Sequence, residues 1–208
     1  MSGAFFFERI DPRNGSRIAI NTRKLVWTAM LSALATVLMY LDTALPVFPG
    51  FLKFDLSDLP SLVASFAYGP LAGVFCELAK NLIHAMTTSS AGIGEFANFL
   101  MGSALVVPAG MIYRYERTRR GALRGLLAGV VCSTVAAALA NYFILLPFYS
   151  QLIPMDKIIA MSSVVITAIH DKQTLIVYGV VPFNLFKGAV IALLTLRLYK
   201  RISALIHE

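Results

Sequence analysis

The stretch VVPFNLFKG, residues 180–188, places a lysine in the middle of an apolar segment. Lys187 has no acidic residue near it in the sequence, whereas Lys80, in another hydrophobic stretch, follows Glu77 by three positions. An ionisable side chain inside a bilayer costs about 2.5–3.5 kcal/mol on insertion scales, so such a residue predicts a functional site. Asn184 lies three residues before Lys187 and therefore on the same helical face. This pair is the first place to expect a bound ligand.

The composition around this segment is that of a membrane protein. The chain has 208 residues, of which 58% are hydrophobic and 14% are charged, whereas soluble domains carry about 25% charged residues. Three charge-free stretches are each about as long as a bilayer-spanning helix requires, namely residues 25–41, 96–113 and 125–155. We therefore expect an all-α integral membrane protein with no separate soluble domain.

Apolar runs and their breaks predict six transmembrane helices. We expect them over residues 24–42, 59–68, 70–86, 95–113, 123–147 and 175–198. The second is too short to span comfortably by itself, and Pro108 predicts a kink in the fourth. A small-residue connection, TTSSAGIG at 87–94, joins the third and fourth. Residues 158–169 reach only about 18 Å as a helix, which is less than the hydrocarbon core, so they predict a short interfacial helix or lid.

The basic residues set the predicted orientation. Thirteen of the 18 lysines and arginines fall in three clusters: Arg9, Arg13, Arg17, Arg23 and Lys24; Arg114, Arg117, Arg119, Arg120 and Arg124; and Arg197, Lys200 and Arg201. Basic flanks stay cytoplasmic, and six spans put all three clusters on one side, whereas a seventh span at 158–169 would not. Both termini are thus expected in the cytoplasm, with a basic cytoplasmic segment at 1–23 and one membrane domain at 24–208.

Polar residues recur on one face of the expected third helix. Glu77, Lys80, Asn81 and His84 follow one another at helical spacing. The pair Glu77–Lys80 reads either as an internal ion pair that holds helices together or as part of a ligand-facing network. Asn81 and His84, nearer the outer end, are the better candidates for ligand contact.

Three further polar residues mark the fourth and fifth helices. Glu95 reads either as a helix N-terminal charge that complements the dipole or as a site residue, and Asn98 lies one turn deeper. Asn141 is the one strongly polar residue between Arg124 and Gln151. It is interpreted either as a hydrogen-bonding residue that holds two helices together or as a ligand contact.

These side chains describe a pocket for a flat, amphipathic, water-soluble molecule. Amides both donate and accept hydrogen bonds, as a ring with an imide edge or a polyhydroxyl chain requires, and nearby aromatic rings supply stacking area. The sequence contains no phosphate-binding loop, nucleophile elbow or H-E-x-x-H metal pair. Cys76 and Cys132 read as small hydrophobes, and we expect neither a metal site nor an enzyme.

Several blocks of the sequence resemble one family. They are FLKFDLSD at 51–58, YGPLAG at 68–73, KNL at 80–82, GEFANF at 94–99, NYFILLP at 141–147 and PFNLFKG at 182–188. In this order they are similar to the riboflavin-binding S-components (RibU type) of energy-coupling factor (ECF) vitamin transporters, from the first helix onward. The resemblance implies a six-helix subunit in a prokaryotic cell membrane. It implies that the subunit captures extracellular riboflavin and works with a transmembrane coupling protein and two ABC ATPases, with riboflavin as cargo and no cofactor.

The resemblance also implies roles for individual residues. In the family, the counterparts of Asn141, Asn184 and Lys187 contact the flavin. The same role is carried over to Glu95. The loop at about 49–58 closes over the ligand, with Leu52 and Phe54 as ring contacts. In the first expected helix, the small residues Ala29 and Ala33 are four positions apart, a spacing that permits close helix–helix approach. The resemblance implies that the coupling protein docks there. By itself this spacing is common in apolar helices.

The resemblance and the polar residues together predict the ligand site Leu52, Phe54, Asn81, His84, Glu95, Asn98, Asn141, Asn184 and Lys187. Because the flavin is neutral, we expect nearby carbonyls or waters to share the protons of Lys187, and Lys187→Ala to lose flavin binding while the protein still inserts and folds. An S-component for another vitamin, or an intramembrane enzyme using Glu77, His84 and Glu95, would be the alternatives. Affinity, discrimination against phosphorylated flavins, oligomeric state and the identity of the partner subunits are open at this point.

Overall fold

The computed structural model describes residues 7–10, 17–20, 22–88 and 92–206. Its helices and strands, in chain order, are β1 Phe7–Ile10, β2 Arg17–Ile20, α1 Thr22–Met39, β3 Thr43–Ala44, β4 Lys53–Phe54, α2 Asp58–Tyr68, α3 Pro70–Ala85, α4 Ile93–Tyr115, α5 Arg119–Ala140, η1 Asn141–Leu145, α6 Leu146–Leu152, α7 Met155–Ser163, α8 Lys172–Thr174, η2 Leu175–Val180 and α9 Val181–Ile206. The elements η1 and η2 are π-helical turns. The strands form two short antiparallel hairpins, β1–β2 and β3–β4.

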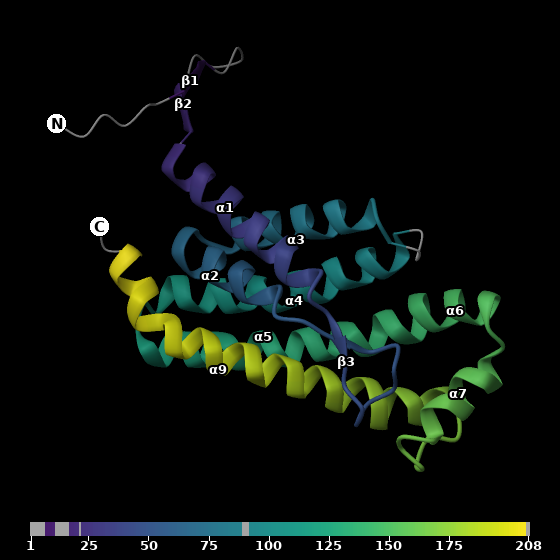
Figure 1. Cartoon of the computed structure of the whole chain (residues 1–208). Helices are drawn as coiled ribbons and strands as arrows, with labels where there is room; N and C mark the ends of the chain where they lie inside the picture. Colours follow the sequence, from purple (N-terminus) through teal and green to yellow (C-terminus); the bar gives the residue numbers. More distant parts are fainter. Residues whose placement is uncertain (1–6, 11–16, 21, 89–91, 207–208) are drawn as a thin grey trace.

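The long helices run roughly along one direction and pack side by side (Figure 1). Helix α4 contacts α3 and α5, and α9 contacts α5 and α2. The start of α1, the connection between α4 and α5 and the end of α9 lie at one end of the molecule, while α6 and α7 lie at the other (Figure 1). The β3–β4 hairpin leads from α1 into α2, so the residues just before α2 lie beside α9.

Local sequence explains where several helices begin. Gly69 separates α2 from α3 with φ of 101°, a conformation that glycine adopts without strain. Pro70 then occupies the first position of α3, where its missing N–H costs no hydrogen bond. Thr118 caps α5 by accepting a hydrogen bond of 3.0 Å from the backbone N–H of Gly121.

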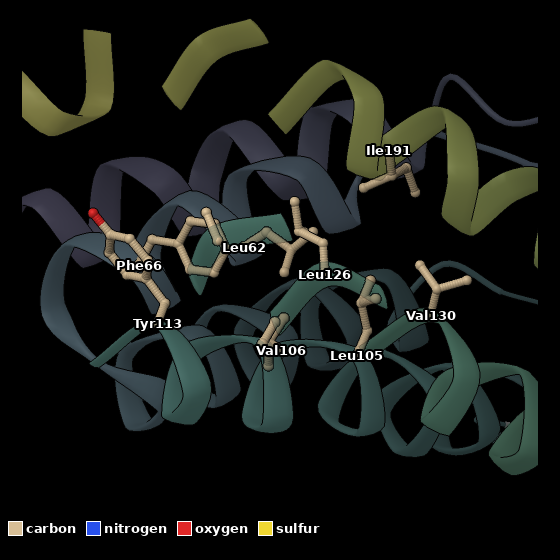
Figure 2. Close-up of a cluster of buried hydrophobic side chains, with 10 residues drawn as sticks. Leu62, Phe66, Leu105, Val106, Tyr113, Leu126, Val130 and Ile191 are labelled. Atoms are coloured by element: carbon tan, nitrogen blue, oxygen red, sulfur yellow. The ribbon is translucent and has the colours of Figure 1, made fainter. Parts of the chain in front are cut away.

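A close-packed apolar core lies between α2, α4, α5 and α9. Figure 2 shows eight of its labelled side chains: Leu62, Phe66, Leu105, Val106, Tyr113, Leu126, Val130 and Ile191. The rings of Phe66 and Tyr113 are 4.6 Å apart between centroids. This core fixes the relative positions of the four helices. Two of them, α4 and α9, carry polar residues nearer to the end of the molecule where α6 and α7 lie.

Among the described residues, three continuous helical runs are long and apolar enough to cross a membrane by length and composition: Ile93–Tyr115, Arg119–Leu152 and Lys172–Leu198. Large apolar side chains are exposed along the outer faces of the helices, as a lipid-facing surface requires. Helix α2 has 11 residues, in agreement with the prediction that it is too short to span by itself.

The predicted helices exist, but several of their ends were wrong. The first helix ends at Met39, not Asp42, and the fifth helical run starts at Arg119 and continues through Pro147 to Leu152. The connection between the fourth and fifth helices is only residues 116–118, because α4 and α5 extend beyond their predicted ends at 113 and 123. In the predicted interfacial segment 158–169, only the residues up to Ser163 are helical, as the end of α7.

The predicted N-terminal segment 1–23 contains the β1–β2 hairpin, which was not predicted. Arg13 of the first basic cluster lies outside the described residues, as do residues 89–91 of the predicted connection between the third and fourth helices.

Candidate functional site

A cavity of about 570 Å³ lies between the loop that precedes α2 and the halves of α4, α5 and α9 that face α6 and α7. This volume is within the usual range for small-molecule sites, about 300–1,000 Å³. The predicted site residues that line it are Leu52, His84, Glu95, Asn98, Asn141, Asn184 and Lys187. The structure therefore brings together side chains that are up to 135 positions apart in the chain.

Lys187 is paired with two carboxylates, although no acidic residue lies near it in the sequence. Its Nζ lies 2.8 Å from Oδ2 of Asp55 and 3.5 Å from Oδ2 of Asp58. Carboxylates share its protons, whereas we had expected carbonyls or waters. The acids come from the loop before α2 and from its first residue, which are far from Lys187 in the sequence but packed against α9.

Asn141 and Asn184 sit at π-helical turns, which often mark functional sites. Asn141 begins η1 and Asn184 follows the end of η2 by one turn. Each amide donates a hydrogen bond of 2.9 Å to a backbone carbonyl of its own helix, at Ala137 and Val180 respectively. The Oδ1 atom of Asn141 is buried and has no hydrogen-bond partner among the described residues. A buried acceptor in this state is available to a donor on a ligand in the cavity.

His84 and Glu95 form a second polar cluster at the cavity wall. Nδ1 of His84 lies 2.8 Å from Oε1 of Glu95, and the His84 ring packs against Tyr40 with centroids 4.9 Å apart. Glu95 is in the first turn of α4, so its position agrees with both interpretations of the sequence. The pair fixes the orientation of two side chains that could hydrogen-bond a ligand.

Asn81 forms hydrogen bonds beside this cluster without lining the cavity. Its Nδ2 donates to the Glu77 carbonyl at 2.8 Å, and its Oδ1 accepts from Nδ2 of Asn98 at 3.1 Å. Asn81 is not among the described residues that line the cavity, whereas Asn98 is. The geometry thus favours Asn98 for ligand contact and gives Asn81 the task of orienting it.

Of the two predicted ring contacts, one lines the cavity among the described residues and the other does not. Leu52 is buried and lines the cavity, as do the aromatic residues Phe51 and Tyr149. Phe54 is not among the described lining residues; its ring lies 6.0 Å from that of Phe186. A direct contact between Phe54 and a ligand therefore stays a prediction.

The predicted ion pair inside the third helix is confirmed, and its lysine has additional partners outside that helix. Nζ of Lys80 lies 2.9 Å from Oε2 of Glu77, and the same ammonium donates to Asp58 and to Oγ of Ser57, the latter at 2.9 Å. Lys80 and Glu77 are fully buried. Because Asp58 also faces Lys187, this pair and the cavity belong to one network of charges.

Sequence reasoning missed Asp55 and Asp58 as site residues. Both lie in the block FLKFDLSD, which was noted for its resemblance and as a loop. A signal was available, because two lysines in apolar helices require counter-charges and the chain contains only 11 acidic residues. The expected coupling-protein motif is placed on the surface: Ala29 and Ala33 are exposed on α1.

Comparisons with known proteins concern the family and the overall fold. A family model described as "ECF transporter, substrate-specific component" matches residues 23–199. A solved structure described as the S component of a bacterial ECF transporter has a TM-score of 0.72 and 33% sequence identity, and the alignment covers 91% of this chain and 100% of that one.

Curated relatives carry related names. The riboflavin transporter RibU of Staphylococcus aureus (strain TCH60) is 34% identical, with 87% of this chain and 90% of the relative covered. The riboflavin transporter FmnP of Bacillus subtilis (strain 168) is 32% identical, with 91% and 96% covered.

Proposed function

Because the chain belongs to the family of substrate-specific components of ECF transporters, we propose that it captures riboflavin outside the cell for uptake driven by partner subunits. The protein is a substrate-binding component and not an enzyme. The relatives named as riboflavin transporters, at 32–34% identity over most of the chain, support riboflavin as the cargo.

The observation that carries the proposal is the cavity and the polar groups on its wall. Asn141, Asn184 and Lys187 come from two helices and line one apolar space of about 570 Å³. The unpartnered Oδ1 of Asn141 suits a ring N–H, and the ammonium of Lys187 suits a carbonyl or hydroxyl oxygen. Leu52 and the neighbouring aromatic side chains supply the apolar area against which a flat ring system stacks.

The remaining predicted contacts are assigned by whether they line the cavity. We assign His84, Glu95 and Asn98 to the ribityl or ring edge nearest α4, since they line the cavity. Asn81 acts through Asn98, and Phe54 contacts the ligand only if the loop before α2 moves when riboflavin binds.

The membrane topology in this proposal has six spanning helical runs and both termini in the cytoplasm. The three basic clusters support it, because the start of α1, the α4–α5 connection and the end of α9 lie at one end (Figure 1). The cavity then lies toward the extracellular side, α7 lies at that interface, and residues 24–208 form one domain of a multi-pass protein in a prokaryotic cell membrane.

The partners follow from the family and from α1. The chain has no phosphate-binding loop of the ATPase type, so energy must come from separate ATPase subunits through a transmembrane coupling protein. We place the coupling protein against Ala29 and Ala33, whose small exposed side chains permit close helix–helix approach.

The test is a titration of purified protein with riboflavin, followed by quenching of flavin fluorescence. We expect saturable binding of one flavin per chain and at least tenfold weaker binding by Asn184→Leu. The matched control is Thr195→Val on the same helix, a fully buried hydroxyl that bonds to Ile191 and does not line the cavity among the described residues. Absence of saturable quenching, with binding of another vitamin instead, would contradict riboflavin as the cargo.

A further inference from the structure

The ammonium of Lys187 is paired with two carboxylates at the cavity wall. Asp55 is 2.8 Å away and Asp58 is 3.5 Å away. The exposed fractions of these three residues are 9%, 8% and 7% for Lys187, Asp55 and Asp58. All three residues also line the cavity, so the pairing is part of the wall that a ligand would meet.

Asp55 is itself held in place. Its Oδ1 accepts a hydrogen bond of 2.8 Å from the backbone N–H of Ser57, while its Oδ2 accepts from Lys187. Both carboxylate oxygens are thus engaged, and the carboxylate has little freedom to rotate. Its position on the loop between β4 and α2 ties that loop to α9.

Asp58 extends the pairing into the core. Its Oδ1 accepts from Lys80, which in turn pairs with Glu77. The result is a row of alternating charges, from Lys187 at the cavity to Glu77 between α3 and α4. These ion pairs hold the ammonium of Lys187 in place when a ligand binds, because moving it would leave buried carboxylates without a partner.

An ammonium has three N–H groups. One of them donates to Asp55, and Asp58 lies at an ion-pair distance of 3.5 Å, so at least one N–H can still donate to a ligand in the cavity. A bare ammonium in this apolar space would favour anions and would be costly beside an uncharged ligand, whereas a neutralised and oriented one can donate a single directed hydrogen bond.

We propose that Asp55 is a positioning residue: it aims one N–H of Lys187 into the cavity and cancels its charge, so that the site prefers an uncharged heteroaromatic ligand to an anionic one. Asp58, whose Oδ2 lies 3.5 Å from Nζ of Lys187, assists as a second negative charge beside the ammonium. This inference rests on the proposed function, because it assumes that Lys187 contacts the flavin.

The test compares four full-length proteins in detergent: the wild type, Asp55→Asn, Lys187→Gln and the double variant. Each is titrated with riboflavin and with its 5′-phosphate, and its folding is monitored by thermal unfolding. We expect Asp55→Asn to weaken riboflavin binding by about 10- to 100-fold, the range for a hydrogen bond to a charged group. The ratio of riboflavin affinity to phosphate-ester affinity should fall at least fivefold. In the Lys187→Gln background, the same Asp55 substitution should change riboflavin affinity by less than about twofold.

The matched control is Asp156→Asn, which removes an exposed carboxylate on α7 that does not line the cavity among the described residues. It should leave both affinities within twofold. If Asp55→Asn does not fold, Asp55→Glu keeps the charge on a longer arm, and it should weaken riboflavin binding while the affinity ratio stays near that of the wild type.

The outcomes separate the two proposals. If the wild type binds riboflavin and Asp55→Asn or Asp55→Glu binds it equally well, the positioning role is wrong and the proposed function stands. An equal loss from Asp55→Asn with and without Lys187 would also overturn the positioning role, since the acid would then act through the fold. A wild type that binds no riboflavin would overturn the proposed function and this inference together.

Discussion

Replacing Asn141 with leucine should move stability and ligand binding in opposite directions. Oδ1 of this side chain is buried with no hydrogen-bond partner among the described residues, and the residue is 2% exposed. An unpartnered buried polar atom costs about 1–3 kcal/mol. Leucine fills a similar space and carries no such atom, so the substitution removes that cost from the ligand-free protein.

The other contact of Asn141 is inexpensive to lose. Its Nδ2 donates to the Ala137 carbonyl, but the same carbonyl also accepts from the backbone N–H of Asn141. The lost side-chain bond is worth about 0.5–1.5 kcal/mol. The net gain is therefore about 1 kcal/mol, or a rise of about 2–4 °C in Tm for a chain of this size.

Binding should weaken in the same variant. A ligand N–H that meets leucine loses its acceptor and stays buried, which costs about 1–3 kcal/mol and raises the Kd for riboflavin by about 5- to 150-fold. Thermal unfolding without ligand and fluorescence titration with riboflavin measure the two effects. Thr134→Val is the matched control, since Thr134 is on the same helical run, is buried and donates to Val130. An Asn141→Leu protein that is less stable and binds riboflavin as tightly as the wild type would refute the reasoning.

Two further predictions concern the packing and charges behind the site, and a third concerns the cap of α8. Gly102→Ala should lower the Tm, because an added Cβ would overlap the carboxylate of the buried Glu77; an unchanged Tm would show that α3 and α4 can separate there without cost. Lys80→Met should lower the free energy of unfolding in denaturant by about 3–5 kcal/mol, because two buried carboxylates lose their shared cation; a loss below 1 kcal/mol would contradict the ion network. Hydrogen bonds from Thr174 lower the pKa of the exposed Asp171 below its usual 3.8, so the cap they form is stable above that pH and is lost as the pH falls through the lowered pKa. Amide exchange at Thr174 should accelerate only below about pH 4, and the same acceleration near pH 6 would assign it to another group.

The apolar runs were sufficient to predict the helices in the right order, while the orientation drawn from the basic clusters stays a prediction. The six runs predicted to span became helices, because a backbone in lipid must satisfy its hydrogen bonds internally, whereas the shorter run 158–169 is helical only up to Ser163. Helix ends were less predictable: Pro147 looked like a terminus, but it lies in the first turn of α6, directly after the π-helical turn η1. The β1–β2 hairpin has no strong alternating pattern and was missed.

The site residues were predictable by type, but their pairings were not. Asn141, Asn184 and Lys187 stood out because polar side chains are rare in these helices, and the structure brings them to one cavity. The partners of Lys187 lie 132 and 129 positions before it, and helical spacing carries no information on such contacts. Those partners also change one expectation: Lys187→Ala would leave two buried carboxylates with one fewer cation, so it should reduce stability as well as riboflavin binding.

The most direct measurement for the central claim is an experimental structure of the protein with riboflavin bound. The account predicts flavin density in the cavity, with ring atoms within hydrogen-bond distance of Asn141, Asn184 and Lys187 and with the pair Lys187–Asp55 intact. Density at another place, such as the outer groove beside Phe96 and Phe143, with the cavity empty, would contradict it.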